Sequence, residues 1–243
     1  MTLIAALRCR EGVVFCSDSQ QTRGLPGRRL ARPAQKLYEP RPGFLFAAAG
    51  AQDVAQELAL RLRGTEAISP NDDRLQLKAR LQEILRELRS DPGIEGRADH
   101  VEFLIAWWAS GERKPVVLHL RGAGAAEWVD DWAFGGMPLA VDLASFALST
   151  LRYLDASALP LAQTKLVVLK VLRDTIETSV EGVGGAVQMA TLEQGRVRVL
   201  AEADLRSLHD AVDLWEAACA ELLGVYVPRS AASAADRPVA RRR

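Results

Sequence analysis

Residues 2–22 of the chain read TLIAALRCREGVVFCSDSQQT. Two apolar runs, 2–9 and 12–19, lie on either side of a short turn at REG. This pattern is typical of a β-hairpin. Pairing of the two strands brings the end of the second back beside the start of the first. The hairpin therefore places Asp18 near Thr2, the residue directly behind Met1.

The segments that follow predict helices in adjacent pairs between groups of strands. After a Gly-, Pro- and Arg-rich loop at 20–35, we expect strands at 36–40 and 43–50, helices at 51–64 and 74–89, strands at 101–109 and 115–122, an extended segment at 126–134, helices at 138–154 and 159–179, a hairpin at 186–201 and a helix at 204–224. Paired helices disfavour a doubly wound parallel sheet and favour two antiparallel sheets packed face to face. The predicted fold class is α+β, a four-layer αββα sandwich.

Length and composition indicate an ordinary globular protein. The chain has 243 residues, of which 49% are hydrophobic and 26% charged, which suits one sizeable domain. We expect this domain to cover residues 1–226 and a disordered basic tail to cover 227–243. Because Lys plus Arg and Asp plus Glu both number 31, the charge balance favours neither nucleic acid nor an acidic membrane surface as a partner, and we expect neither.

The sequence contains no motif that points to a cofactor, a metal or a membrane. Its three cysteines form no CxxC or Cys/His cluster, and no nucleotide-binding loop is present. No signal peptide precedes the first strand, and no apolar run approaches the ~18–20 residues of a membrane span. We therefore expect a cytoplasmic protein without a cofactor or metal.

Thr2, Asp18 and Lys36 together suggest a nucleophile with its supporting groups. A threonine hydroxyl needs a base to take its proton, and the free α-amine of an N-terminal Thr can be that base. The amine has a pKa of about 7.7 to 8.0 in peptides, and a neighbouring ammonium lowers it further. The scheme requires removal of Met1, a strand that fixes Thr2, and a Lys held by a carboxylate. The chain offers Lys36 and Asp18 for the last two roles.

These segments resemble proteasome β-type subunits of the Ntn-hydrolase superfamily, and most closely the bacterial HslV-type branch. The opening 2–22 is similar to the family's nucleophilic Thr, hairpin and Asp-x-Gln/Arg-x-Thr signature, here Asp18, Gln20 and Thr22. KLYEP resembles the segment that the family's catalytic Lys opens, which makes Lys36 the match. The resemblance covers roughly residues 2–225, and its specific motifs lie in the first fifty.

The resemblance also implies an oxyanion hole and a substrate-binding surface. GFLFAAAGAQD resembles the turn before the first helix, so the Gly50 amide would hold the oxyanion. Ala48 would line a roomy specificity pocket. Gln20 and Thr22 would lie beside a substrate backbone, which the family binds as an added strand.

Two segments depart from the family pattern. A Gly-Ser-Gly segment, whose Ser supports the terminal amine, is replaced by AFGGMPLA, so that Gly135 or Gly136 stands where a hydroxyl is expected. An Asp-x-x-Ser-Gly motif is replaced by TSVEGVGGA. There, Ser179 with Gly182, or Glu181 with Gly184, could occupy the two places. Ser179 is the catalytic candidate from this segment.

The resemblance implies a threonine endopeptidase that cleaves unfolded polypeptides inside a homo-oligomeric double ring. Because the chain has no nucleotide-binding loop, unfolding would fall to a separate ATP-dependent partner. The altered AFGGMPLA and TSVEGVGGA segments leave open a catalytically weak or silent ring subunit on the same fold. A third possibility is an Ntn amidohydrolase that acts on a small amide.

Overall fold

The computed structural model describes residues 2–23, 30–64, 73–94, 96–109, 111–122, 124–151, 155–178 and 183–222. The strands are β1 (Leu3–Arg8), β2 (Gly12–Asp18), β3 (Gln20–Arg23), β4 (Leu30–Pro33), β5 (Leu37–Arg41), β6 (Phe44–Ala49), β7 (Glu102–Trp107), β8 (Val116–Arg121), β9 (Ala126–Trp128), β10 (Trp132–Gly136), β11 (Val187–Glu193) and β12 (Arg196–Val199). The α-helices are α1 (Gln52–Gly64), α2 (Arg74–Arg89), α3 (Pro138–Thr150), α4 (Leu161–Thr178) and α5 (Glu202–Leu222). Short 3-10 helices cover Ala98–His100 and Ala156–Ala158.

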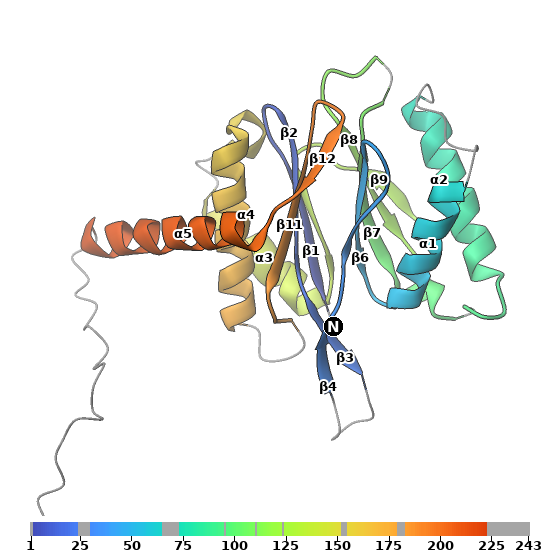
Figure 1. The fold of residues 1–243 in the computed structure, drawn as a ribbon, viewed down its shortest axis with the longest axis horizontal. Coiled ribbons are helices and arrows are strands. Elements are labelled where there is room, and N and C mark those ends of the chain that lie inside the picture. Colours follow the sequence, from blue (N-terminus) through green and yellow to red (C-terminus); the bar gives the residue numbers. More distant parts are fainter. Residues whose placement is uncertain are drawn as a thin grey trace, which may run out of the picture.

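Most of the strands belong to two five-stranded sheets. Their orders are β10-β1-β2-β11-β12 and β5-β6-β7-β8-β9, and neighbouring strands are antiparallel. The sheets lie against each other, with α3 and α4 outside the first and α1 and α2 outside the second (Figure 1). The predicted mixture of helices with two antiparallel sheets is therefore confirmed.

The opening hairpin is the centre of the first sheet. β1 pairs with β2, where Ile4 lies opposite Ser17, and its other side pairs with β10, where Leu3 lies opposite Gly136. Almost every residue of β1 and β2 is buried, because both faces of this sheet are covered. Thr2 therefore enters the fold at the start of a strand held on both sides.

The space between the two sheets is filled by an apolar layer, which we call the inter-sheet layer. Its buried residues are Ile4, Ala6, Val13, Phe15, Leu37, Leu45, Ala47, Ala49, Leu104, Ala106, Val117, Val129, Ala190 and Leu192. Side chains alternate along a strand, so the remaining apolar positions of these strands pack against the helices outside. Alanines at many of these positions let the sheets approach closely.

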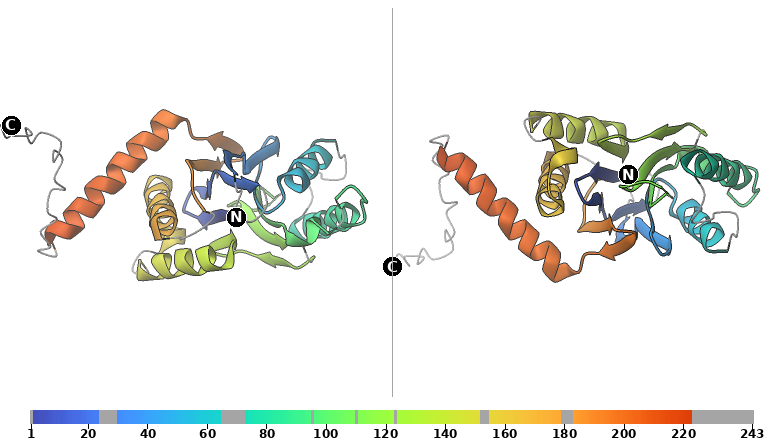
Figure 2. Two further views of the ribbon diagram at one scale, coloured as in Figure 1. Left: turned by 90° about the horizontal axis from the view of Figure 1, so that it is seen from below. Right: turned by 90° about the horizontal axis from the view of Figure 1, so that it is seen from above.

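The helices begin where the sequence places their caps. The Asp73 carboxylate accepts hydrogen bonds from the Leu75 and Gln76 amides and caps α2, while Pro138 lies in the first turn of α3. α5 differs from the other helices because Val212 is its one buried residue. Figure 2 shows α5 extending away from the body of the molecule.

Two segments differ from the sequence prediction. The predicted loop at 20–35 contains the paired strands β3 and β4, which project from the sheets as a ribbon (Figure 1). The extended segment at 126–134 is divided between β9 and β10, which belong to different sheets. The tail 227–243 lies outside the described residues. Among those residues, no helix combines the length and apolarity that crossing a membrane requires.

Candidate active site

Thr2 is held through its backbone at the start of β1. Its carbonyl oxygen accepts a hydrogen bond from the Met137 amide at 2.9 Å, and the next amide, Leu3 N–H, donates to Asp18 Oδ1 at 2.9 Å. Thr2 itself is 7% exposed. The backbone on the C-terminal side of the predicted nucleophile is thus fixed from two directions.

Asp18 ends β2 with a fully buried carboxylate. Oδ1 accepts from Leu3 N–H and from Lys36 Nζ, the latter at 2.7 Å, and Oδ2 accepts from Gly184 N–H at 3.1 Å and Gln20 N–H at 3.3 Å. A buried carboxylate is costly unless such donors satisfy it. Asp18 therefore joins β1, β3, the segment before β5 and the segment before β11.

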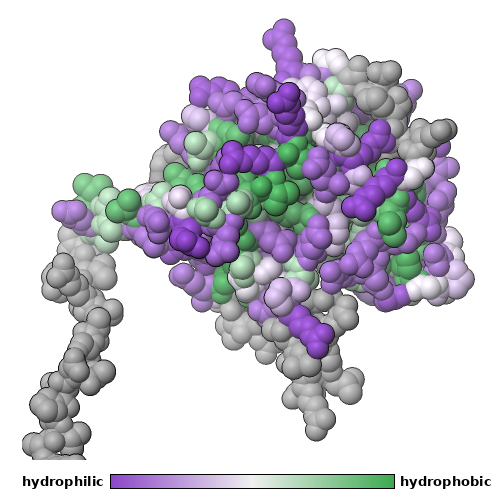
Figure 3. Space-filling model, in the orientation of Figure 1, coloured by the Kyte–Doolittle hydropathy of each residue, from purple (hydrophilic) through white to green (hydrophobic). Residues whose placement is uncertain are grey.

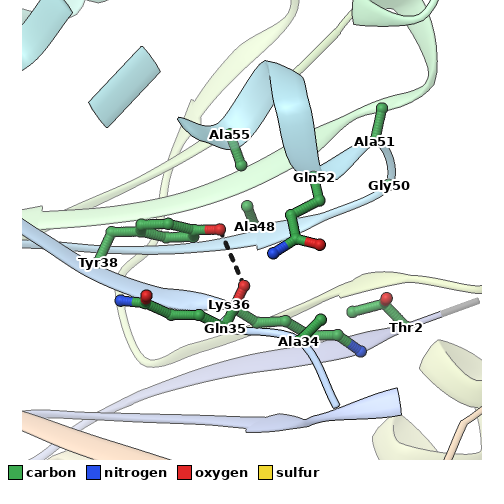
Figure 4. Close-up of a pocket in the computed structure, with 10 residues that line it drawn as sticks. All are labelled: Thr2, Ala34, Gln35, Lys36, Tyr38, Ala48, Gly50, Ala51, Gln52 and Ala55. Carbon is green, nitrogen blue, oxygen red and sulfur yellow. Dashed lines mark hydrogen bonds between the residues drawn. The ribbon is translucent and has the colours of Figure 1, made fainter. Parts of the chain in front are cut away.

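Lys36 is buried and directed toward the predicted nucleophile. Its Nζ bonds Asp18 Oδ1 at 2.7 Å and the Gln20 carbonyl at 2.8 Å, and its amide donates to Gln188 Oε1 at 3.0 Å. Burial lowers the pKa of Lys36, and the charge and hydrogen bond of Asp18 offset only part of that effect. The side chain runs toward Thr2 in Figure 4. Its ammonium is therefore less firmly protonated than that of an exposed lysine.

A pocket of about 290 Å³ of empty space, part of it open to solvent, joins the predicted residues. Its lining residues are Thr2, Ala34, Gln35, Lys36, Tyr38, Ala48, Gly50, Ala51, Gln52 and Ala55 (Figure 4). Four alanines line the pocket with small apolar side chains, and the hydroxyl of Tyr38 donates to the Gln35 carbonyl at 2.8 Å. The structure thus brings Thr2, Lys36, Ala48 and Gly50 together around one opening.

Gly50 lies in a turn that requires glycine. Its φ is +113°, and a Cβ atom built there would lie 2.5 Å from the His100 carbonyl oxygen. The turn leads directly into α1, which begins at Gln52. The Gly50 amide is therefore at a helix N-terminus on the rim of the pocket, where backbone N–H groups favour negative charge.

Of the other predicted residues, the structure describes Gln20 and Thr22 but not Ser179. The Gln20 carbonyl accepts a hydrogen bond from Lys36 Nζ, and the Gln20 amide donates to Asp18 Oδ2. Thr22 lies in β3 opposite Ala31. Ser179, the catalytic candidate from TSVEGVGGA, lies outside the described residues.

The segment after α4, for which the sequence allowed two alignments with the family motif, contacts the site through its backbone at Gly184. Gly184 N–H bonds Asp18, and Gly184 O accepts from the Gln20 amide at 2.8 Å. The alternative with Gly184 in the motif therefore puts this glycine beside the predicted catalytic residues. Glu181 and Gly182, like Ser179, lie outside the described residues.

Sequence reasoning missed Glu102 and His119 beside the Gly135–Gly136 pair. His119 Nε2 and Gly136 N–H both lie within hydrogen-bonding distance of Glu102 Oε2, at 3.1 and 3.2 Å. The hydrogen bonds from these groups outweigh burial and lower the pKa of Glu102. Glu102 comes from the other sheet, so no local pattern could have revealed the contact.

The described residues contain no group of three or more His, Cys, Asp or Glu side chains placed to hold a metal ion. The arrangement that they do form consists of a hydroxyl, a buried Lys–carboxylate pair and a helix N-terminus around one pocket. These are the parts needed for acyl transfer with oxyanion stabilisation.

No protein-family model and no curated protein matches the sequence. Solved structures do match the fold. A Gly-1 mutant of Anbu from Hyphomicrobium sp. strain MC1 has a TM-score of 0.72 at 17% identity, covering 92% of this chain and 97% of that one. Anbu (ancestral beta-subunit) from Yersinia bercovieri has a TM-score of 0.72 at 16% identity, covering 91% and 96%.

These comparisons correct the predicted identity. The sequence resemblance pointed to proteasome β-type subunits, and most closely to the HslV-type branch, but no family match supports that assignment. The structural neighbours are Anbu proteins, and at 16–17% identity they show the fold alone. The chain has a proteasome-like fold of the kind found in Anbu.

Proposed function

We propose that this protein is an Ntn hydrolase that cleaves peptide bonds with Thr2 as its nucleophile, after removal of Met1. The observation that carries the proposal is the buried Asp18–Lys36 pair, which adjoins Thr2 in one pocket. A buried charge pair is a costly arrangement unless it is well satisfied, and perturbed ionisable groups gather at functional sites.

The proposed reaction begins at the Thr2 hydroxyl. The free α-amine of Thr2 takes the hydroxyl proton, and the oxygen attacks the substrate carbonyl to form a tetrahedral intermediate. The Gly50 amide stabilises the oxyanion, and the amine returns the proton to the leaving nitrogen as the peptide bond breaks. Water then hydrolyses the Thr2 ester. The positive charge of Lys36, which Asp18 orients, lowers the pKa of the amine. The amine therefore stays neutral and can accept the hydroxyl proton.

The pocket suits an extended polypeptide with an uncharged side chain at the cleavage site. Ala34, Ala48 and Ala55 line it with small apolar side chains, and Gln52 adds an uncharged amide beside Ala48. The ribbon β3–β4, which contains Gln20 and Thr22, would receive the substrate backbone as an added strand. Unfolded polypeptide is therefore the proposed substrate class.

The proposal extends to the assembly of several copies of the chain. We propose that the two sheets and their outer helices are the four-layer Ntn arrangement, and that copies of the chain form a homo-oligomeric double ring that encloses the pockets. Such a chamber admits only unfolded chains, so a separate ATP-dependent unfoldase would supply folded substrates. The similarity in fold to Anbu supports the subunit architecture but carries none of the activity.

The test is labelling of Thr2 with a peptide epoxyketone, followed by intact-mass analysis. We expect the protein to lack Met1, to gain one inhibitor mass, and to lose that adduct in Thr2→Ala. Ser207→Ala, at an exposed hydroxyl of α5, is the control and should label as the unmodified sequence does. A chain that retains Met1, or that stays unlabelled although Thr2 is free, would contradict the proposal.

The second candidate is a catalytically silent subunit on the same fold. It is favoured by Gly135 and Gly136, which provide no hydroxyl near Thr2. Absence of both labelling and casein cleavage in a purified, assembled ring with free Thr2 would support this candidate.

A further inference from the structure

Glu102 and His119 place two polar side chains beside the inter-sheet layer. They lie two positions from Leu104 and Val117, which face that layer, so alternation along β7 and β8 turns them the same way. His119 is 6% exposed, and the Glu102 side chain is 31% exposed. Polar groups beside an apolar layer cost free energy unless they are hydrogen-bonded, and these two side chains lie 3.1 Å apart at His119 Nε2 and Glu102 Oε2.

The Glu102 carboxylate occupies the space that a side chain at position 135 would need. A Cβ atom built on Gly135 would lie 2.8 Å from Glu102 Oε2 and 3.2 Å from Ile4 Cγ1. A side chain at position 135 would therefore displace the Glu102 carboxylate from its present place. The same oxygen accepts from Gly136 N–H at 3.2 Å, while His119 Nε2 lies 3.1 Å away from it.

This contact is connected to the predicted nucleophile through the backbone. Gly136 lies opposite Leu3 in the β1–β10 pairing, and the Met137 amide bonds the Thr2 carbonyl at 2.9 Å. A Cβ atom on Gly136 would lie 2.0 Å from that carbonyl oxygen, so the two backbones touch. A shift of the Gly136–Met137 segment would therefore move Thr2.

We propose that Glu102 is a positioning residue for Thr2, which it orients by anchoring the Gly136–Met137 segment. His119 fixes the carboxylate in turn. The pair thus acts on Thr2 through the backbone, at the strand end that carries Gly135 and Gly136. This inference rests on the proposed function, because it assigns Glu102 to the alignment of the Thr2 nucleophile.

The first measurement is the rate of Thr2 labelling by the peptide epoxyketone, separated into kinact and KI. We expect Glu102→Ala to lower kinact by about 10- to 100-fold, because small misplacements of reacting groups have effects of this size. KI should stay unchanged, since Glu102 does not line the pocket. Glu102→Gln keeps an oxygen acceptor for Gly136 N–H and should restore most of the rate.

Two further variants separate positioning from loss of folding. Gly135→Ala pushes the carboxylate away without removing it, so it should lower kinact as Glu102→Ala does. Glu127→Ala removes a 62% exposed carboxylate from β9, which is separated from β7 by β8, and it should leave kinact unchanged. Normal labelling of both Glu102→Ala and Gly135→Ala, or a Glu102→Gln protein as slow as Glu102→Ala, would overturn the inference.

Amide hydrogen exchange tests the anchor without any chemistry. In Glu102→Ala and Gly135→Ala, the amides of Gly136, Met137 and Leu3 should exchange faster than in the unmodified sequence and in Glu127→Ala. Faster exchange in a protein that the inhibitor never labels would refute the proposed function but support the role of Glu102 in anchoring the Gly136–Met137 segment. Unchanged exchange would sink the anchor even in a chain that labels normally.

Discussion

At the scale of single residues, the Asp18–Lys36 pair dominates the site. Its two side chains are 0% and 6% exposed, and Asp18 also satisfies the Leu3 and Gly184 amides. A pair this deeply buried contributes little to net stability while it is intact, because desolvation offsets the attraction. Removal of one partner has a much larger effect, since it leaves the other charge buried and unpaired.

We therefore expect Asp18→Ala to lower the free energy of unfolding by about 3–5 kcal/mol. The matched control is Asp174→Ala, which removes a partner of Lys170 on α4, where the side chains are 22% and 36% exposed. That change should cost less than about 1 kcal/mol, because solvent screens the pair. Urea titrations followed by circular dichroism measure both values. Equal losses in the two variants would show that the Asp18 pair is not isolated from water.

The depressed pKa of Lys36 predicts how stability depends on pH. Burial favours the neutral amine in the folded protein, so in the window between the folded pKa and the usual value near 10.5 the unfolded state binds more protons. The free energy of unfolding should rise with pH across that window. Lys36→Met has no group that titrates in this window. The free energy of unfolding of the unmodified protein should therefore increase relative to that of Lys36→Met as pH rises. Parallel pH curves for the two proteins would contradict the assignment.

Much of the candidate site was accessible from the sequence because its parts are local. Thr2 and Asp18 are the ends of one hairpin, and Lys36 and Gly50 flank the β5–β6 hairpin. Glu102 could not be found in this way. Its contact with Gly136 spans 34 residues and joins two sheets, so it depends on how the sheets pack.

At the scale of elements, hydrophobic pattern predicted most strands and helices and the pairing within the hairpins at 2–19 and 186–201, but not the pairing of strands far apart in the chain. β9 and β10 are separated by three residues, 129–131, yet β9 pairs with β8 in one sheet and β10 with β1 in the other. β3 and β4 are held together by backbone pairing, and their Gly-, Pro- and Arg-rich surroundings give no alternating pattern. Pairing between distant strands is a property of the packed molecule, which local propensity does not encode.

At the scale of the whole molecule, α5 stands apart from the rest of the fold. It projects from the body in Figures 1 and 2, and its outer half exposes Leu214 by 72% and Leu222 by 87%. Figure 3 shows hydrophobic surface at its far end. Together with Ala218, these residues lie at i, i+4 and i+8, which places them on one face of the helix.

The outer half of α5 is held to its own chain mainly by ion pairs of Asp213 and Glu216 with α4 and by Trp215, and its Leu214–Leu222 face is left exposed. Segments shorter than about 12–15 residues are marginal as isolated helices in water, and most helical stability comes from packing of an apolar face. In the proposed ring, this face of α5 would pack against a second copy. The far half of α5 is therefore the part of the chain whose stability should depend most on assembly.

We expect Leu214→Glu to dissociate the proposed ring, because it replaces an exposed apolar side chain of this face with a charge. Size-exclusion chromatography with light scattering should find a multiple of the 26.5 kDa chain for the unmodified sequence and a smaller species for Leu214→Glu. Leu60→Glu is the matched control, since Leu60 is a leucine of α1 that is 57% exposed. It should assemble normally. A monomeric unmodified protein would refute the ring, and normal assembly of Leu214→Glu would remove α5 from its interface.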